Sequence, residues 1–565
     1  MNGVAGARGT LGPAPRRMAL GELLAADPAH ADVVVTGLTL DSRDVAPGEL
    51  YLALPGRATH GLEHAADAIR RGAVAVATVP GALAGRPRAA AALEAVRTPD
   101  GARAHVLEID GLESSAGALA SRFFDAPDAA LRIVAVTGTD GKTSVCRFLA
   151  GALARLGTRA GYIGTIGWGV VADEPRRAAG RSGEGDGAAP ASGLAPSALT
   201  TPDAVALVRM LAALRDAGCE AVAMEASSHG IAEGRLEGLA IDVAVLTNLG
   251  RDHLDYHGTV EAYGRAKARL FDAPGLNVAV LNANDALGAE LAARLARRGE
   301  TGEPAPRVVT FAVAPAARGA SGPAADIVAE RVAQDPDGLR FELVEGAARS
   351  RVSSPLLGRF NVDNLLAARA ALRALGAGFE PSASALGAAR PVPGRMERVA
   401  APAGPDGSPA RGPVAIVDFA HTADALGAAI AAARAHCPGR LHVVFGCGGD
   451  RDRGKRAPMA RAAEAADRVV LTDDNPRTEP SGRIIDDVLA GFADPSRVAV
   501  VPDRRDAIER TVAEAGDRDV VLVAGKGHEA HQIVGTERRP FSDREAVREA
   551  LGRRAAARAS AGAAA

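Results

Sequence analysis

The feature that most constrains the fold is an apolar segment that runs into a glycine-rich turn and then into a helix-like stretch. The apolar residues Ile133–Val136 precede TGTDGKTS at residues 137–144. A strand, a glycine turn and a helix form a βα unit whose backbone N–H groups can approach phosphate oxygens. Lys142 can neutralise phosphate charge, and the Thr143 hydroxyl is suited to Mg²⁺. The segment predicts a phosphate-binding site, although Val136 stands where the common GxxxxGK[ST] pattern has its first glycine.

Apolar strands alternate with helix-like stretches over most of the chain, which is typical of α/β domains with mainly parallel sheets. At about 150 residues per domain, 565 residues suggest three or four domains. We expect three domains: a small α/β domain at 30–109, a central P-loop ATPase-like doubly wound domain at 110–391, and a Rossmann-like domain at 392–552. The central domain is expected to carry a flexible loop at 174–197. A flexible N-terminal extension and lead-in at 1–29, with Met18 as an alternative start, and a disordered tail at 553–565 are expected at the two ends.

Composition excludes several classes of protein. The chain is 47% hydrophobic and 24% charged, with a formal net charge of -2, so neither a disordered chain nor a nucleic-acid binder is expected. Its four cysteines show neither a disulfide framework nor zinc spacing. No apolar run reaches the roughly 18 residues of a membrane span, and the N-terminus is not a secretory signal. A cytoplasmic protein is expected.

Two further polar segments follow predicted strands. MEASSHG at residues 224–230 carries Glu225, and TNLGRDHLDYHG at residues 247–258 places two His and two Asp within six residues. Ligands of open α/β sheets bind beyond the carboxyl ends of the strands. Any one of these side chains alone would be read as an ordinary loop residue. Beside a phosphate loop, they predict a metal site.

The chain resembles the ATP-dependent Mur ligase family between Leu40 and Asp543. The resemblance depends on motifs in the family's order: GTDGKT, MEASSHG, TNLGRDHLDYHG, GRFNVDNLLAA, GRMER, FAHTADAL, FGCGGDRDRGKR, DDNPR and AGKGHE. It implies an enzyme of peptidoglycan precursor synthesis that joins meso-2,6-diaminopimelate to the D-glutamate side-chain carboxylate of UDP-N-acetylmuramoyl-L-alanyl-D-glutamate. ATP phosphorylates that carboxylate, and the amine then attacks the acyl phosphate. The implied partners are these three small molecules, acting on a monomeric enzyme.

The resemblance implies a nucleotide and metal site in the central and third domains. Lys142, Lys267 and His253 are the implied catalytic residues, with Lys267 carbamylated. Mg²⁺ is implied to bind Thr143, Glu225, His253 and the Lys267 carbamate. The implied ATP-binding residues are Gly138, Thr139, Asp140, Gly141, Lys142, Thr143, Ser144, Asn361, Asn364, Arg395 and Asp418.

The resemblance also implies two sites for the compounds that are joined. Leu40, Ser42 and the stretch 57–59 match the uridine-nucleotide site, and the muramoyl dipeptide is implied to contact Thr200, Thr201, Ser227 and Arg235. Leu199 and Glu233 stand where the family has amide side chains. The implied diaminopimelate residues are Arg451, Asp474, Asn475, Pro476, Arg477, Gly525 and Glu529.

The diaminopimelate residues match the chemistry of that amino acid. Arg477 and Arg451 can bind its distal carboxylate bidentately, while Glu529 and the Gly525 carbonyl can accept its distal ammonium. Lysine has no distal carboxylate, so Arg477 argues against a lysine-adding ligase.

Other functions remain as alternatives. LTLDSR, HLDYHG and DNPR argue against a folylpolyglutamate synthetase, and the absence of an NKxD motif argues against a P-loop GTPase. A non-catalytic nucleotide-binding scaffold could dispense with Lys142, Glu225 and Lys267, which are all present.

Overall fold

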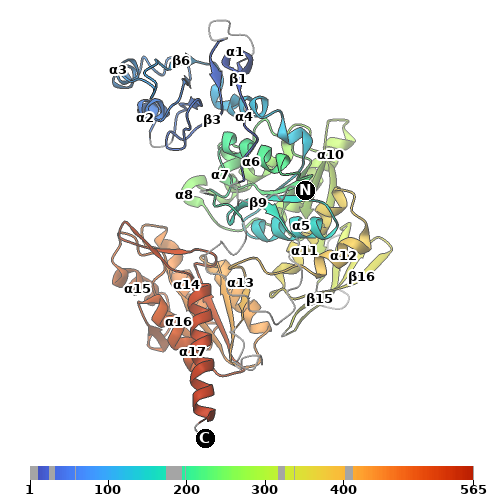
Figure 1. The fold of residues 1–565 in the computed structure, drawn as a ribbon. Helices are drawn as coiled ribbons and strands as arrows, with labels where there is room; N and C mark the ends of the chain where they lie inside the picture. Colours follow the sequence, from blue (N-terminus) through green and yellow to red (C-terminus); the bar gives the residue numbers. More distant parts are fainter. Residues whose placement is uncertain are drawn as a thin grey trace, which may run out of the picture. The chain divides into compact units, whose positions relative to one another are not determined.

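The computed structural model describes most of the chain, which is drawn as a ribbon in Figure 1. The chain divides into two compact units. The described residues are 11–24, 32–56, 59–172, 194–197, 199–315, 325–335, 337–400 and 412–563. The described residues of the first unit fall within 1–173, 193–281 and 286–309, and those of the second fall within 282–285 and 310–565. In the described parts, no helix combines the length and apolar character that crossing a bilayer requires.

The first unit begins with a small parallel sheet in the order β3-β4-β5-β6. Leu20 and Leu23 are fully buried in the core beside it. The elements are β1 Met18–Ala19, α1 Leu20–Leu23, β2 Val34–Val35, β3 Leu38–Thr39, β4 Leu50–Leu52, a 3₁₀ turn at Gly61–His64, α2 Ala65–Arg70, β5 Ala75–Thr78, α3 Pro87–Ala95 and β6 His105–Glu108.

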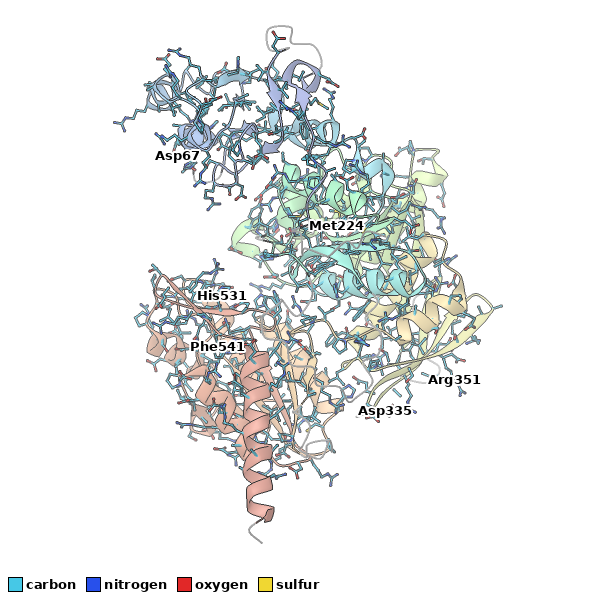
Figure 2. The ribbon with its side chains drawn as sticks, viewed as in Figure 1. Asp67, Met224, Asp335, Arg351, His531 and Phe541 are labelled. Carbon is cyan, nitrogen blue, oxygen red and sulfur yellow. The ribbon has the colours of Figure 1, made fainter. Side chains whose placement is uncertain are left out.

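The larger sheet of the first unit has the order β12-β11-β7-β10-β8-β9 and is parallel except for the hairpin β8–β9. Its central strands are almost wholly apolar and buried, as expected for strands covered on both faces. Figure 2 labels Met224 in β10, whose side chain is fully buried. The elements are α4 Leu112–Phe123, β7 Arg132–Thr137, α5 Lys142–Arg155, β8 Ala160–Gly164, β9 Gly167–Val171, α6 Ala204–Asp216, β10 Ala221–Glu225, α7 Ser228–Ala232, β11 Val243–Leu246, α8 Leu254–His257, α9 Val260–Ala268, β12 Val278–Asn282 and α10 Ala286–Glu300.

The predicted loop at 174–197 lies outside the described residues except for 194–197. There Ala195 and Trp168 of β9 exchange two backbone hydrogen bonds of 2.8 Å. Residues 57 and 58, predicted for the uridine-nucleotide site, also lie outside the described residues, as do 1–10 and 25–29 of the predicted N-terminal extension.

The second unit opens with strands in the order β13-β14-β15-β16, of which the last three are antiparallel. This meander was not predicted from the sequence, although residues 339–343 in β15 (LRFEL) alternate between apolar, buried positions and charged, more exposed ones. The elements are β13 Arg307–Val313, β14 Ile327–Asp335, β15 Gly338–Glu345, β16 Ala348–Ser354, α11 Phe360–Ala374 and α12 Phe379–Gly387.

The C-terminal sheet has the order β17-β18-β22-β19-β20-β21, with only β17 antiparallel. Ile416 of β18 packs with α13, α14 and α15, whereas Val417 packs on the other face with α16 and α17, so the sheet is doubly wound. The elements are β17 Glu397–Val399, β18 Val414–Asp418, α13 Ala423–Ala435, β19 Leu441–Phe445, α14 Arg456–Ala463, β20 Arg468–Leu471, α15 Ser481–Leu489, β21 Val498–Val500, α16 Arg504–Glu514, β22 Val520–Ala524, β23 His531–Val534, β24 Glu537–Pro540 and α17 Asp543–Ala563.

Candidate active site

The predicted phosphate loop lies between β7 and α5. Lys142 begins α5 and its Nζ donates hydrogen bonds of 2.9 Å to the carbonyls of Gly138 and Thr139. Thr143 and Ser144 are buried in the first turn of this 14-residue helix. A helix N-terminus with free N–H groups and a lysine beside it fits a phosphate group.

A second loop, which follows β11, holds the phosphate loop in place. Thr139 N donates to Asn248 O at 2.9 Å, and Asp140 N donates to Asn248 Oδ1 at 3.0 Å. Gly138 has a φ of +149°, and a Cβ atom there would lie only 1.8 Å from Thr247 Oγ1. The two strand-end motifs predicted from sequence therefore meet, and glycine is required where they touch.

Glu225 ends β10 with its carboxylate buried. The Tyr162 hydroxyl and the Thr165 N–H donate to Oε1 at 2.6 and 2.9 Å, and Thr165 Oγ1 donates to Oε2 at 3.0 Å. A Cβ on Gly164 would lie 2.2 Å from Glu225 Oε1, so the β8–β9 turn closes tightly on the carboxylate. Tyr162 and Thr165 were not predicted from sequence, because neither belongs to a recognised motif.

Lys267 is a buried side chain of α9. It is 1% exposed, its Nζ donates to Gly138 O at 2.7 Å, and the same atom lies 4.2 Å from the centre of the Tyr263 ring. Burial and the nearby Lys142 lower the pKa of the Lys267 amine well below its ordinary value. The structure thus brings Lys267 to the phosphate loop, whereas its position on a helix would otherwise indicate a solvated surface lysine.

Histidine and tyrosine rings gather beside the phosphate loop. His253 has a φ of +52°, and the centre of its ring lies 4.7 Å from that of His229. His257 lies 5.6 Å from His229 by the same measure, and its Nε2 is 3.0 Å from Ser228 Oγ. Burial lowers the pKa of His253, which favours the neutral imidazole that a metal ligand requires.

The site offers oxygen atoms of the kind that Mg²⁺ prefers as ligands. Within the described ranges, no group of three or more His, Cys, Asp and Glu side chains could hold a metal ion. Mg²⁺ usually takes one or two protein carboxylates and completes its shell with water and substrate phosphates. The Glu225 carboxylate and the Thr143 hydroxyl are oxygen donors of that kind, and the His253 nitrogen suits Mg²⁺ less well.

The residues predicted for the muramoyl dipeptide lie close to Glu225. Thr201 Oγ1 donates to Glu225 O at 2.8 Å and accepts from Ser227 N at 2.9 Å. Arg235 donates to Thr201 O at 2.6 Å and also pairs with Glu233. Thr200 is joined to the same network, because its Oγ1 lies 3.0 Å from Thr165 Oγ1. These contacts connect the predicted dipeptide residues to the predicted metal ligand.

The two positions that depart from the family pattern have different surroundings. The Leu199 side chain is 46% exposed, and the Glu233 carboxylate pairs with Arg235. Leu40 and Ser42, predicted for the uridine nucleotide, lie just after β3 and are half-buried. Whether these residues contact substrate stays a prediction.

The predicted amino-acid residues lie in the second unit, around the loop after β20. Arg477 has a φ of +53° and its Nη1 donates to Gly449 O at 2.9 Å. Gly449 approaches this loop so closely that a Cβ there would lie 2.0 Å from Pro476 O. Burial and the neighbouring Arg451 lower the pKa of the Arg477 guanidinium. A Cβ at Gly448 would lie 3.0 Å from Arg477 Nη1 and 3.8 Å from Arg451 Cγ, so the two arginine side chains lie near each other. Their role in binding the amino acid stays a prediction.

Arg395 and Asp418 also belong to the second unit. The Arg395 guanidinium lies 4.2 Å from the centre of the Phe419 ring, and the His528 ring lies 5.1 Å from Phe419. The Asp418 carboxylate accepts from Met396 N at 2.7 Å and from Ala420 N at 2.8 Å. The stack of Arg395, Phe419 and His528 was not predicted, because its members come from three separate motifs.

Asn361 and Asn364 are buried near the start of α11. Asn361 Nδ2 donates to Leu357 O at 2.8 Å, and Asn364 Nδ2 donates to Asn361 Oδ1 at 3.0 Å. The roles of Asn361, Asn364, Arg395 and Asp418 toward the nucleotide stay predictions.

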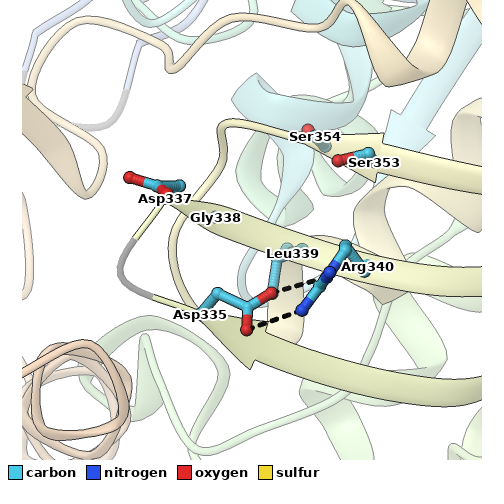
Figure 3. A pocket seen from close by; sticks show the side chains of 7 residues that line it. All are labelled: Asp335, Asp337, Gly338, Leu339, Arg340, Ser353 and Ser354. Carbon is cyan, nitrogen blue, oxygen red and sulfur yellow. Dashed lines mark hydrogen bonds and ion pairs between the residues drawn. The ribbon is translucent and has the colours of Figure 1, made fainter.

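A separate polar pocket of about 340 Å³ opens beside the β14–β15 hairpin (Figure 3). The Asp335 carboxylate and the Arg340 guanidinium form an ion pair of 2.7 Å across it. None of its lining residues was predicted for a site. They are Asp335, Asp337, Gly338, Leu339, Arg340, Ser353 and Ser354.

Three family profiles match the chain in succession. The "Mur ligase family, catalytic domain" matches residues 34–110, the "Mur ligase middle domain" residues 136–372, and the "Mur ligase, glutamate ligase domain" residues 394–527. The chain belongs to the Mur ligase family. The expected α/β fold with three domains is thereby confirmed.

Curated relatives match this Mur ligase over nearly its whole length. A protein of Xylella fastidiosa named UDP-N-acetylmuramoyl-L-alanyl-D-glutamate--2,6-diaminopimelate ligase is 44% identical over 95% of this chain and 98% of the relative. A protein of Pseudomonas putida with the same name is 41% identical over 93% of this chain and 96% of the relative.

Solved structures share the same fold. A structure of a UDP-N-acetylmuramoyl-L-alanyl-D-glutamate--2,6-diaminopimelate ligase has a TM-score of 0.61 and 34% identity, covering 94% of this chain and 98% of that one. A folylpolyglutamate synthase of Mycobacterium tuberculosis has a TM-score of 0.56 but only 20% identity, covering 74% and 93%. The second likeness concerns the fold alone.

Proposed function

We propose that this Mur ligase adds meso-2,6-diaminopimelate to the D-glutamate side-chain carboxylate of UDP-N-acetylmuramoyl-L-alanyl-D-glutamate, with ATP converted to ADP and phosphate. The relatives that bear the name of this activity are 41–44% identical over nearly the full length. The observation that carries the proposal within the chain is the phosphate loop with buried Glu225 and Lys267 on its neighbouring elements. Its place would be the cytoplasm, where it would act as a monomer in peptidoglycan precursor synthesis.

The reaction needs chiefly positioning and charge neutralisation. The N–H groups of α5 and Lys142 bind the β- and γ-phosphates, where the ammonium offsets the charge that grows on the transferred group. The substrate carboxylate attacks the γ-phosphorus and forms an acyl phosphate, with ADP leaving. The amine of diaminopimelate then attacks the acyl carbon, and phosphate leaves as the amide forms. Mg²⁺, held by Thr143, Glu225 and His253, would neutralise phosphate charge.

Carbamylation of Lys267 is part of the proposal. A neutral amine must attack carbon dioxide, forming an N–C bond and releasing one proton to water. Burial and Lys142 lower the pKa of Lys267, which raises the fraction of neutral amine near pH 7. The carbamate would be an anion next to the phosphate loop, where it can support the metal and balance Lys142. In the structure, the amine nitrogen of Lys267 lies 2.7 Å from Gly138 O.

The choice of amino acid is assigned to the loops of the C-terminal sheet. Arg477 and Arg451 bind the distal carboxylate of diaminopimelate, and Glu529 with the Gly525 carbonyl accepts its distal ammonium. Asp474, Asn475 and Pro476 shape the same pocket. Bound lysine would leave the guanidinium groups of Arg477 and Arg451 without a carboxylate partner. Lysine would therefore be disfavoured, because a polar site rejects a ligand that leaves its buried groups unpaired.

The experiment that tests this function measures phosphate release with each substrate omitted in turn. We expect release only when ATP, the uridine-linked dipeptide and meso-diaminopimelate are all present. Release that needs ATP alone would instead indicate an ATPase, and release that needs a folate would favour the synthetase alternative. The same assay on Arg477→Ala should show a steep rise in the KM for diaminopimelate, with little change for ATP, because a bidentate contact is lost.

A further inference from the structure

A fully buried lysine lies beneath the predicted amino-acid site. Lys526 follows β22 between Gly525 and Glu529, and its side chain is 0% exposed. Its Nζ donates to Asn475 Oδ1 at 3.0 Å and to Glu529 Oε2 at 2.8 Å. A buried ammonium is costly unless it is paired and hydrogen-bonded, so these contacts indicate a specific role for the charge.

Lys526 determines which way the Asn475 amide faces. Asn475 Oδ1 accepts from both Lys526 Nζ and Ile533 N, the latter at 2.9 Å, so the oxygen must point toward these two donors. The Asn475 amide nitrogen is thereby turned to Glu529, donating to Oε2 at 3.0 Å. A flipped amide would place an N–H group against two donors. One cation therefore orients two residues predicted to bind the amino acid.

The same ammonium fixes the Glu529 carboxylate and compensates its charge. Oε2 of Glu529 accepts from Lys526 and from Asn475, whereas no hydrogen bond to Oε1 is found in the described parts of the chain. Burial raises the pKa of Glu529, but the charge and hydrogen bond of Lys526 act together with the hydrogen bond from Asn475 and hold that pKa below its ordinary value. Glu529 is thus kept ionised with one oxygen available for an incoming ammonium.

Asp474 adds a second carboxylate to this arrangement. Its Oδ1 is buried without a hydrogen-bond partner among the described residues, and Lys526 Nζ lies 3.6 Å away. Lys526 is thus in ion-pair range of two carboxylates, Glu529 and Asp474, and each has an oxygen that accepts no hydrogen bond among the described residues. Carboxylate oxygens without a partner beside a buried cation are an arrangement that suits a ligand ammonium.

We propose that Lys526 is a positioning residue for the amino-acid substrate, which holds Asn475 and Glu529 in the orientation that binds the distal amino-acid head. The inference rests on the proposed function, because it assumes that these two residues bind diaminopimelate. Lys526 cannot itself contact the substrate while its side chain remains fully covered.

The test compares Lys526→Met with wild type in the ligation assay, with the KM of each substrate measured separately. The Met side chain is one atom shorter than that of Lys but fills most of the same space, and it removes the charge. We expect the KM for meso-diaminopimelate to rise at least about tenfold, because one partner of a buried charged network is lost. The KM for ATP and for the uridine-linked dipeptide should stay within about twofold. Lys526→Gln, whose amide can still donate hydrogen bonds although it carries no charge, should show a smaller rise.

A control variant separates positioning from general stabilisation of the domain. Arg554→Met removes another cation of the same sheet domain, which donates to Ala513 O at 2.8 Å and contacts none of the predicted site residues. It should lower the thermal midpoint without a selective change in the KM for diaminopimelate. Equal rises for all three substrates in Lys526→Met, or no rise in a folded variant, would overturn the assignment. So would the failure of both Lys526 variants to fold, since the lysine would then be needed for folding.

The wild-type arm of the experiment keeps the two proposals distinguishable. If the wild type does not use meso-diaminopimelate, the proposed function fails, and the KM comparison is made with the amino acid that it does use. If the wild type uses meso-diaminopimelate while Lys526→Met keeps a wild-type KM for it, only the positioning role fails.

Discussion

Replacing Glu225 by glutamine removes the charge of the proposed metal ligand while changing its shape very little. In the native site, Oε1 accepts from the Tyr162 hydroxyl and the Thr165 N–H, so the amide oxygen of glutamine must take that position. Among the described residues, Oε2 accepts only from Thr165 Oγ1, whose hydrogen can turn instead to Thr200 Oγ1 at 3.0 Å. The new amide nitrogen can then donate to Thr165. Glu225→Gln is therefore expected to fold.

The expected changes in the free energy of unfolding and in kcat follow from these contacts. One amide hydrogen is left without a partner, which costs about 1–3 kcal/mol, and the loss of a buried charge offsets part of this. We expect the free energy of unfolding to change by less than about 2 kcal/mol. Losing one charge that stabilises the transition state costs on the order of 3 kcal/mol, or about a hundredfold in kcat.

The assay measures kcat as a function of Mg²⁺ concentration, beside a urea unfolding curve. Glu225→Gln should lower kcat about a hundredfold and raise the Mg²⁺ concentration needed for half-maximal activity. Glu220→Gln is the matched control, because Glu220 is an exposed residue just before β10. A folded Glu225→Gln enzyme with wild-type kcat and Mg²⁺ dependence would refute the role of Glu225 as a metal ligand.

Three further outcomes are expected. Lys142→Ala should lower turnover at least about a hundredfold while the protein stays folded, and near-normal turnover would contradict the phosphate-loop assignment. Lys267→Ala should be nearly inactive and partly restored by acetate or formate, whereas a normal rate would exclude an essential carbamate. Burial and Arg395 lower the pKa of His528 from 6.5 to about 4, so the unfolded chain binds more protons than the folded one between these values. The contribution of His528 to the free energy of unfolding should therefore be fully present above about pH 6.5 and be lost as the pH falls toward 4. Urea unfolding of His528→Asn should show a weaker decrease of the free energy of unfolding over this pH range.

The geometry of the predicted phosphate loop followed from the sequence, because its parts are local in sequence. Residues 137–144 carry the strand end, the turn and the helix start within a few residues, so their geometry follows from the βα unit. Glu225 and the loop after β11 were predictable for a related reason, since the ends of parallel strands meet at one edge of a sheet. The role of Lys267 was predicted from the family resemblance alone, because a lysine on a helix is ordinarily exposed to solvent.

The supporting side chains could not be predicted, because their roles depend on contacts distant in sequence. Tyr162 meets Glu225 from 63 residues away, and Lys526 meets Asn475 from 51 residues away. A tyrosine or a lysine in isolation gives no signal of such a partner. The β14–β16 meander is different, since the alternation of apolar and charged residues at 339–343 (LRFEL) could have predicted an antiparallel strand.

The central claim is tested most directly by a competition between amino acids. The enzyme is given ATP, the uridine-linked dipeptide, and equal concentrations of meso-diaminopimelate and L-lysine, and the products are separated and identified by mass spectrometry. The account predicts that the diaminopimelate adduct forms almost alone, with one ADP released for each amide bond. A lysine adduct as the main product, or no adduct from diaminopimelate, would contradict it.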